Sequence, residues 1–353
     1  MVRMRLALAL LILLLVPSTA VAGLAETEVR TLQDDTGKGC VVTPEACVIV
    51  TFKYTADPGD ANDVEITRDG ADLLVRDMGA ANIRAGNGCK PQGAKRIRCS
   101  PPEGPSTGLN RMVVQLGDMA DVLDDKVTGS ASLEAEGGPG DDRLFGNEGF
   151  DTLGGGAGAD RLEGGASVDY LGDGVGGGGL EPDVMDGGDG ADRVSYAGRT
   201  NRVTVNLATV GPNAGEQSEG DTLASIEDVR GGRGPDVLRA GQGAVLLSGR
   251  GGNDQLVGGS GNDQLLGDSG NDKVDGRFGK DRVWGGKGDD RLRGGCDGDR
   301  VSGEAGRDRL FDADGSRDVL SGGTDRDFAE YDPSDDLRRI ETRRLLRIDA
   351  CAL

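Results

Sequence analysis

The stretch GRGGNDQLVGGSGNDQLLGDSGNDKVD, residues 249–275, consists of three consecutive units of nine residues. Each unit has Gly at positions 1 and 4, Asp at position 6 and an aliphatic residue at position 8. Outward from this stretch, the same period runs from Gly231 to Phe311. An earlier block starts at Gly137 with GGPGDDRLFGNEGFDTLGGGAGADRLEGGASVDYLG and resumes with GGDGADRVS at 187. A fixed period of this kind indicates a repeat architecture.

Position 8 is aliphatic in every unit, whereas positions 7 and 9 are mostly polar. This alternation is typical of a very short strand with one buried residue. The glycines at positions 1, 2 and 4 suit a tight turn, because they adopt backbone angles that other residues resist. We therefore predict an all-β chain whose repeats wind a parallel β-roll, or β-solenoid, with two repeats per coil. The position-8 residues are Leu144, Leu153, Leu162, Leu171, Met185, Val194, Leu238, Leu247, Leu256, Leu265, Val274, Val283, Leu292, Val301 and Leu310.

Position 6 carries the candidate metal ligands. With two repeats per coil, residues 18 apart stack on one edge, so that paired carboxylates and turn carbonyls would surround a cation. Oxygen ligands on a flexible backbone favour Ca²⁺ over Mg²⁺, which demands stricter geometry. The alternative is that each Asp only caps a turn. Only Val245 interrupts the series, whose members are Asp142, Asp151, Asp160, Asp169, Asp183, Asp192, Asp236, Asp254, Asp263, Asp272, Asp281, Asp290, Asp299 and Asp308.

Eight pairs of these residues are 18 apart, which predicts multiple calcium ions. The pairs are Asp142/Asp160, Asp151/Asp169, Asp236/Asp254, Asp254/Asp272, Asp272/Asp290, Asp290/Asp308, Asp263/Asp281 and Asp281/Asp299.

The consensus G-G-x-G-x-D-x-L-x resembles the calcium-binding nonapeptide of haemolysin-type, or RTX, proteins. The resemblance implies a secreted protein that binds calcium in its glycine-rich turns. Residues 196–230 are similar to the segment that separates repeat blocks in such proteins, where the coil is enlarged. The overall layout is similar to small exported calcium-binding proteins of actinobacterial type. The chain departs from members that carry a carboxy-terminal secretion signal, because it has an amino-terminal leader instead.

The amino terminus has the pattern of a secretory signal peptide. Arg3 and Arg5 precede the apolar run 6–16, and Ala20-Val21-Ala22 forms a small-residue cleavage site. The run is shorter than the ~20 residues that span a bilayer. We expect cleavage after Ala22, a secreted chain and no membrane span afterwards.

The sequence divides into six segments: signal peptide 1–22, a Cys-containing β region 23–131, a first repeat block 132–195, an enlarged coil 196–230, a second block 231–323 and a carboxy-terminal cap 324–353. Within the β region, the stretch 116–123 resembles a degenerate repeat. The six cysteines fit an oxidising compartment. Proximity favours the disulfides Cys40–Cys47 and Cys89–Cys99, and leaves the pairing of Cys296 and Cys351 open.

Composition excludes several functions. The 353 residues include no His, which excludes Ser-His-Asp triads and His-based zinc sites. The formal charge of −21 argues against nucleic acid as a partner. We expect a non-enzymatic protein with a structural or surface-interaction role, such as binding a cell-surface or matrix polymer. The alternatives are a surface adhesin and an extracellular hydrolase or epimerase whose repeats assist folding, with Asp221, Glu227 and Asp228 as candidate carboxylates.

Overall fold

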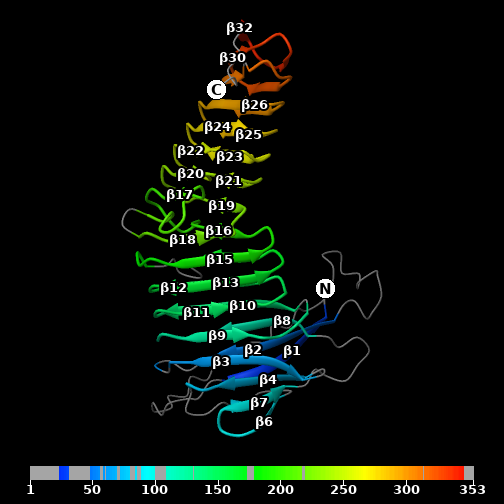
Figure 1. Ribbon diagram of the computed structural model, residues 1–353, viewed down its shortest axis with the longest axis vertical. Coiled ribbons are helices and arrows are strands. Elements are labelled where there is room, and N and C mark those ends of the chain that lie inside the picture. Colours follow the sequence, from blue (N-terminus) through cyan, green and yellow to red (C-terminus); the bar gives the residue numbers. More distant parts are fainter. Residues whose placement is uncertain are drawn as a thin grey trace, which may run out of the picture.

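The fold is a tall stack of short strands, seen side-on in the computed structural model (Figure 1). The structure describes residues 24–31, 48–55, 59, 61–69, 72–79, 84–85, 89–99, 109–129, 131–172, 179–216, 219–312 and 314–345. Every regular element in these ranges is a strand, and none is a helix that could cross a membrane. The predicted signal peptide and Cys40, Cys47 and Cys351 lie outside the described residues.

One sheet of 15 strands runs the full length of the stack. In spatial order its strands are β31 (Asp336–Arg338), β29 (Val319–Thr324), β27 (Arg300–Ala305), β25 (Arg282–Lys287), β23 (Gln264–Ser269), β21 (Leu246–Ser248), β19 (Asp228–Arg230), β16 (Arg193–Ser195), β14 (Tyr170–Gly172), β12 (Thr152–Ala157), β10 (Ser132–Pro139), β8 (Leu109–Gln115), β2 (Val48–Thr55), β1 (Leu24–Thr31) and β5 (Arg84–Ala85).

Two shorter sheets, of nine and eight strands, supply the other set of repeats. The nine-stranded sheet contains β18 (Thr222–Ala224), β15 (Val184–Asp189), β13 (Arg161–Ala166), β11 (Arg143–Phe145), β9 (Val122–Asp125), β3 (Asp63–Asp69), β4 (Asp72–Asp77), β7 (Arg96–Cys99) and β6 (Cys89–Pro91). The eight-stranded sheet contains β17 (Thr204–Asn206), β20 (Val237–Arg239), β22 (Gln255–Val257), β24 (Lys273–Phe278), β26 (Arg291–Cys296), β28 (Arg309–Asp312), β30 (Phe328–Tyr331) and β32 (Thr342–Leu345).

Repeats alternate between the two sides of the stack, so each strand pairs with the second one along the chain. Leu256 of β22 aligns with Val274 of β24, and Leu265 of β23 aligns with Val283 of β25, both in parallel register. These residues are buried at position 8 and form the core between the sheets. The predicted β-solenoid with an 18-residue coil is therefore confirmed.

The insertion 196–230 changes one wall of the solenoid. The nine-stranded sheet ends at β18 and the eight-stranded sheet begins at β17, whereas β19 continues the 15-stranded sheet. Val203 and Val205 are buried there, but β17 spans only three residues rather than the longer strand that their alternation suggests. A buried ion pair between Arg199 and Glu219 holds the insertion together.

The stack extends beyond the repeat blocks at both ends. At the amino-terminal end, β9 pairs in parallel with β11, which makes residues 116–123 a true coil. Before it, β3, β4, β7 and β6 form an antiparallel meander that the predicted Cys89–Cys99 disulfide closes. At the other end, β30 and β32 continue the parallel pairing within the segment expected to be a cap. Cys296 is also disulfide-bonded.

Candidate calcium sites

The position-6 aspartates form hydrogen-bonded ladders along the stack. Each lies immediately before a strand and is at most 5% exposed. Its Oδ1 atom accepts a hydrogen bond from the backbone N–H of the residue stacked on it in the preceding coil. The N–H of Asp254, for example, donates to Oδ1 of Asp272 at 2.7 Å. All eight pairs predicted at 18-residue spacing make this contact.

The second carboxylate oxygen of most ladder residues is buried without a hydrogen-bond partner. This holds for Oδ2 of Asp142, Asp169, Asp192, Asp254, Asp272, Asp281, Asp290, Asp299 and Asp308. Burial, reinforced by the neighbouring carboxylates, raises the pKa of Asp254 and Asp281 to about 7 and that of Asp299 to about 8. An unpartnered buried anion is unfavourable, so each such oxygen calls for a proton or a cation.

The glycine at position 1 keeps space open beside this oxygen. A Cβ on Gly267 would lie 2.5 Å from Oδ2 of Asp272 and 2.5 Å from the carbonyl oxygen of Gly285, one coil later. The same relationship recurs at Gly276, between Asp281 and the carbonyl of Gly294. Carboxylate and carbonyl oxygens therefore face a common space in each turn. A set of hard oxygen donors on a glycine-rich backbone fits calcium.

Three of the aspartates differ because they stand next to a coil without a position-6 carboxylate. The Oδ2 atoms of Asp151, Asp236 and Asp263 accept hydrogen bonds from N–H groups of their own turns, at 2.8, 2.6 and 2.7 Å. The residues that donate to their Oδ1 atoms are Leu133, Val203 and Val245. Every one of the position-6 Asp residues therefore accepts a backbone hydrogen bond, and most have a second oxygen without a hydrogen-bond partner.

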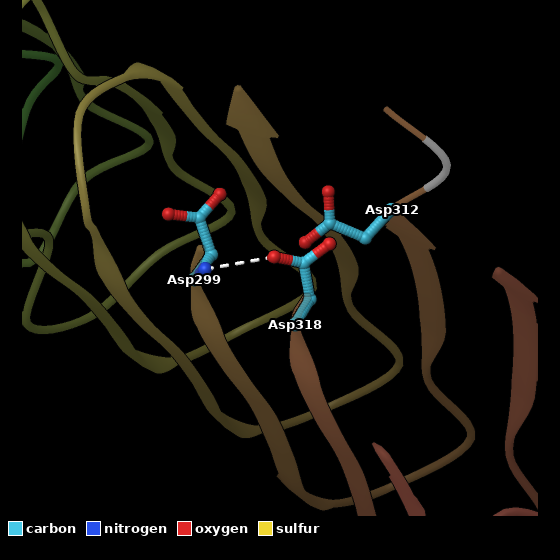
Figure 2. A group of neighbouring side chains, drawn as sticks. All are labelled: Asp299, Asp312 and Asp318. Carbon is cyan, nitrogen blue, oxygen red and sulfur yellow. Dashed lines mark hydrogen bonds between the residues drawn. The ribbon is translucent and has the colours of Figure 1, made fainter. Parts of the chain in front are cut away.

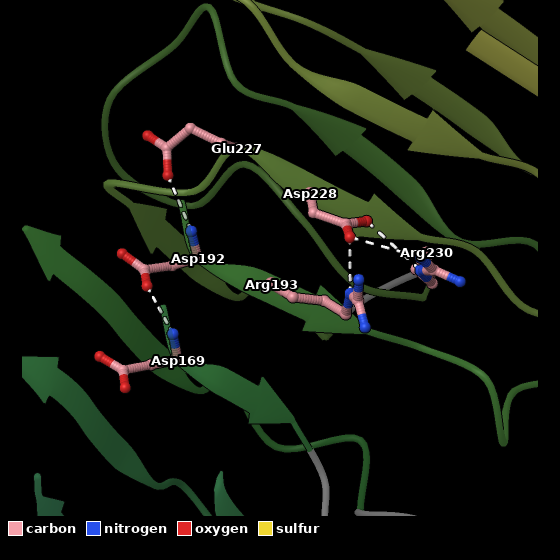
Figure 3. Close-up of polar contacts among 6 residues, drawn as sticks. All are labelled: Asp169, Asp192, Arg193, Glu227, Asp228 and Arg230. Atoms are coloured by element: carbon pink, nitrogen blue, oxygen red, sulfur yellow. Dashed lines mark hydrogen bonds and ion pairs between the residues drawn. The ribbon is translucent and has the colours of Figure 1, made fainter. Parts of the chain in front are cut away.

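The ladder crosses the irregular segments. Figure 3 shows Asp169 donating its N–H to Asp192, and Asp192 donating to Oε2 of Glu227 at 3.0 Å. Glu227 therefore replaces aspartate where the insertion joins the 15-stranded sheet. Beside it, Asp228 pairs with Arg193 at 2.6 Å.

The ladder also includes carboxylates that the nonapeptide alignment did not select. Each precedes a strand at a coil of irregular length, as Asp318 does in accepting the N–H of Asp299 (Figure 2). The signal in the sequence is an acidic residue followed by a short strand whose first and third residues point outward and whose second residue points into the core. The number of residues between this acidic residue and the previous one can vary. These additional ladder residues are Asp121, Asp221, Glu227, Asp318, Asp327, Asp335 and Glu341.

These features define a class: parallel β-solenoids whose glycine-rich turns carry stacked carboxylates. In a comparison with protein families, the RTX calcium-binding nonapeptide repeat matches this chain in four copies, at residues 136–171, 178–198, 230–265 and 266–295. Over these residues the chain therefore carries RTX calcium-binding nonapeptide repeats of the haemolysin type. No curated protein matches this sequence.

Proposed function

We propose that this protein is exported, that calcium binding drives the folding of its solenoid, and that its role is structural or one of surface interaction rather than catalytic. The observation that carries the proposal is the column of buried carboxylates whose second oxygens have no hydrogen-bond partner. Asp254, Asp272 and Asp290 are stacked in consecutive coils, each at most 2% exposed. Without cations at neutral pH, the negative charges in this column repel one another from coil to coil.

The carboxylates of the insertion support the non-enzymatic part of the proposal, because backbone or side-chain groups already engage them. Asp221 accepts hydrogen bonds from the hydroxyl of Tyr196 at 2.9 Å and the N–H of Asp183 at 3.0 Å. Glu227 belongs to the ladder and Asp228 is paired with Arg193. All three act as structural links between coils.

The outer face of the eight-stranded sheet supports a surface role. A groove of about 480 Å³ there is lined by five cationic residues and four acidic ones: Arg239, Lys273, Arg277, Arg291, Arg293, Asp275, Asp312, Asp314 and Glu330. The guanidinium of Arg291 lies 4.4 Å from the centre of the Phe311 ring, which holds it in place. Cationic side chains on a strongly acidic protein are suited to an acidic polymer, so we propose such a glycan as the surface partner.

The decisive experiment is a calcium titration of the chain, starting in excess chelator and followed by far-ultraviolet circular dichroism. The expected result is a gain of strand signal with a cooperative calcium dependence, because each coil is a template for the next. Strand signal that is already complete in chelator would contradict calcium-driven folding. Binding of the calcium-loaded chain to an immobilised acidic glycan, compared with the Arg291→Glu variant, tests the surface role.

A further inference from the structure

The coil after Phe311 is one of the places where the regular pattern of the turns changes. Here the unit has ten residues rather than nine, since Asp318 follows its ladder partner Asp299 by 19 residues. The first position of this unit is Asp312, where the consensus has Gly. Asp312 ends β28 and is 2% exposed, so a carboxylate is buried at a position where the other repeats have Gly or, at Ala240, another small residue.

This carboxylate occupies the place of a turn carbonyl. In the regular coil before it, a Cβ on Gly276 would meet the carbonyl oxygen of Gly294 at 2.2 Å and Oδ2 of Asp281 at 2.4 Å. In the irregular coil, a Cβ on Gly294 would meet Oδ2 of Asp312 at 2.0 Å and Oδ2 of Asp299 at 2.6 Å. A neutral oxygen has therefore been replaced by a charged one in an equivalent position.

Asp318 completes the group, whose three side chains are drawn in Figure 2. One carboxylate oxygen from each of Asp299, Asp312 and Asp318 lies within 4.8 Å of the others, and all three residues are buried. Each Oδ1 accepts a backbone N–H, from Asp281 at 2.8 Å, Gly295 at 3.4 Å and Asp299 at 2.8 Å respectively. Each Oδ2 is buried with no hydrogen-bond partner.

None of the ion pairs in the described part of the chain involves these three residues. Three carboxylates in one buried space, each with an unpartnered oxygen, call for protons or a cation. Ca²⁺ affinity rises with the number of charged ligands and with the rigidity of the site.

We propose that Asp299, Asp312 and Asp318 together bind one calcium ion, and that this site is tighter than the repeat turns. It shares Asp299 and Asp318 with the ladder but depends on Asp312, which no repeat turn uses. The site would therefore persist even if the regular turns bound no calcium, so its failure and that of the proposed function can be distinguished.

The test is a titration of the full chain with Ca²⁺, and with Tb³⁺ as a luminescent probe, counting ions bound at each step. The wild-type chain should bind one ion with a dissociation constant at least about tenfold below that of the remaining sites. Asp312→Gly, which restores the consensus residue, should lose only that step. Asp312→Asn, which keeps the side-chain shape, should lose it too. Asp275→Asn removes a charge from the outer face of β24 and serves as the control that should retain it.

A tight step that persists in both Asp312 variants would overturn the proposal, as would a wild-type titration in which no site is tighter than the rest. Circular dichroism in saturating calcium establishes that each variant is folded before its ions are counted. If the wild-type chain binds only this single ion, the site stands and the calcium-dependent folding of the repeat turns is refuted.

Discussion

The backbone N–H of Asp272 donates to Oδ1 of Asp290 at 2.8 Å, while Oδ1 of Asp272 accepts the N–H of Asp254 at 2.7 Å. A single residue thus joins three coils through its backbone and side chain, and its Oδ2 remains unpartnered in the turn. The carboxylate has a structural task that an amide could also perform and a charge that only a cation can balance.

Replacing Asp272 with Asn should separate these two roles. The amide keeps an oxygen for the N–H of Asp254, and its N–H₂ group faces the carbonyl of Gly285. In chelator the variant should be more stable than wild type, because a buried charge is removed. In a hundredfold excess of calcium over Kd it should be less stable, by up to about 2.7 kcal/mol for each ion lost.

Chemical denaturation with and without calcium measures both signs for this variant. Asp275→Asn, which changes the same charge on the outer face of β24, is the control and should show neither effect. A loss of stability in both conditions would mean that the charge of Asp272 does not destabilise the calcium-free folded state.

Acid should partly replace calcium. Burial raises the pKa of Asp142 and Asp281 to about 7 and that of Asp299 to about 8, from an ordinary value of 3.8. Between about pH 4 and 8 the folded chain therefore holds protons that the unfolded chain has released, so folding stability falls as the pH rises through this window. In chelator, the strand signal in circular dichroism should be stronger at pH 5 than at pH 8. A calcium-free chain that gains structure on going from pH 5 to pH 8 would refute the argument.

The disulfide between Cys89 and Cys99 should stabilise the amino-terminal meander without affecting calcium. It links β6 to β7, far along the stack from the second repeat block (Figure 1). The double variant Cys89→Ser/Cys99→Ser should lower the stability of this region by about 2–4 kcal/mol. The number of calcium ions bound, measured by equilibrium dialysis, should not change. Fewer bound ions in the variant would show that the meander and the repeats fold as one unit.

The ion pair of Arg199 and Glu219 should control how the two walls join. The Arg199 side chain is 8% exposed and that of Glu219 is fully buried, so Glu219→Gln would leave a buried cation with a weakened partner. Breaking such a pair costs about 3–5 kcal/mol. Thermal unfolding in calcium should show this loss, whereas Glu216→Gln, which changes an exposed contact to Asn201, should have little effect. Equal melting temperatures for the two variants would rule out a structural role for the pair.

Much of the fold could be predicted because the period itself encodes it. Leu256, Asp254 and Gly249 recur at fixed offsets, which gives the coil length, the inward residues and the stacking of the aspartates. The extra ladder residues escaped the alignment because a strand and its preceding carboxylate tolerate turns of different length. Asp318 and Glu227 hold their places although their spacings to the previous coil are 19 and 35 residues.

The replacement of the nine-stranded sheet by the eight-stranded sheet at the insertion could not be derived from the sequence pattern. The alternation of Val203 and Val205 predicts a strand but does not say which sheet it joins, since both walls bury the same kind of residue. The sequence also does not show which position-6 aspartates have an Oδ2 that accepts a hydrogen bond and which have an unpartnered Oδ2. It depends on what lies one coil earlier, as at Val245, whose N–H caps Asp263 but which offers no carboxylate of its own.

The hydrogen bonds of the carboxylate ladder all run in the same direction along the chain, so the two ends of the ladder differ in the group they leave unpaired. In every rung the earlier coil donates and the later coil accepts, as from Asp308 to Asp327. During folding, each coil thus has an unpaired backbone N–H until the next coil, 18 residues later in a regular repeat, has docked onto it. Within this ladder, shortening the chain from its carboxyl end would uncover such a donor, whereas shortening it from the amino end would uncover a carboxylate acceptor. The ladder hydrogen bonds of each coil are therefore completed by the coil that follows it in the sequence.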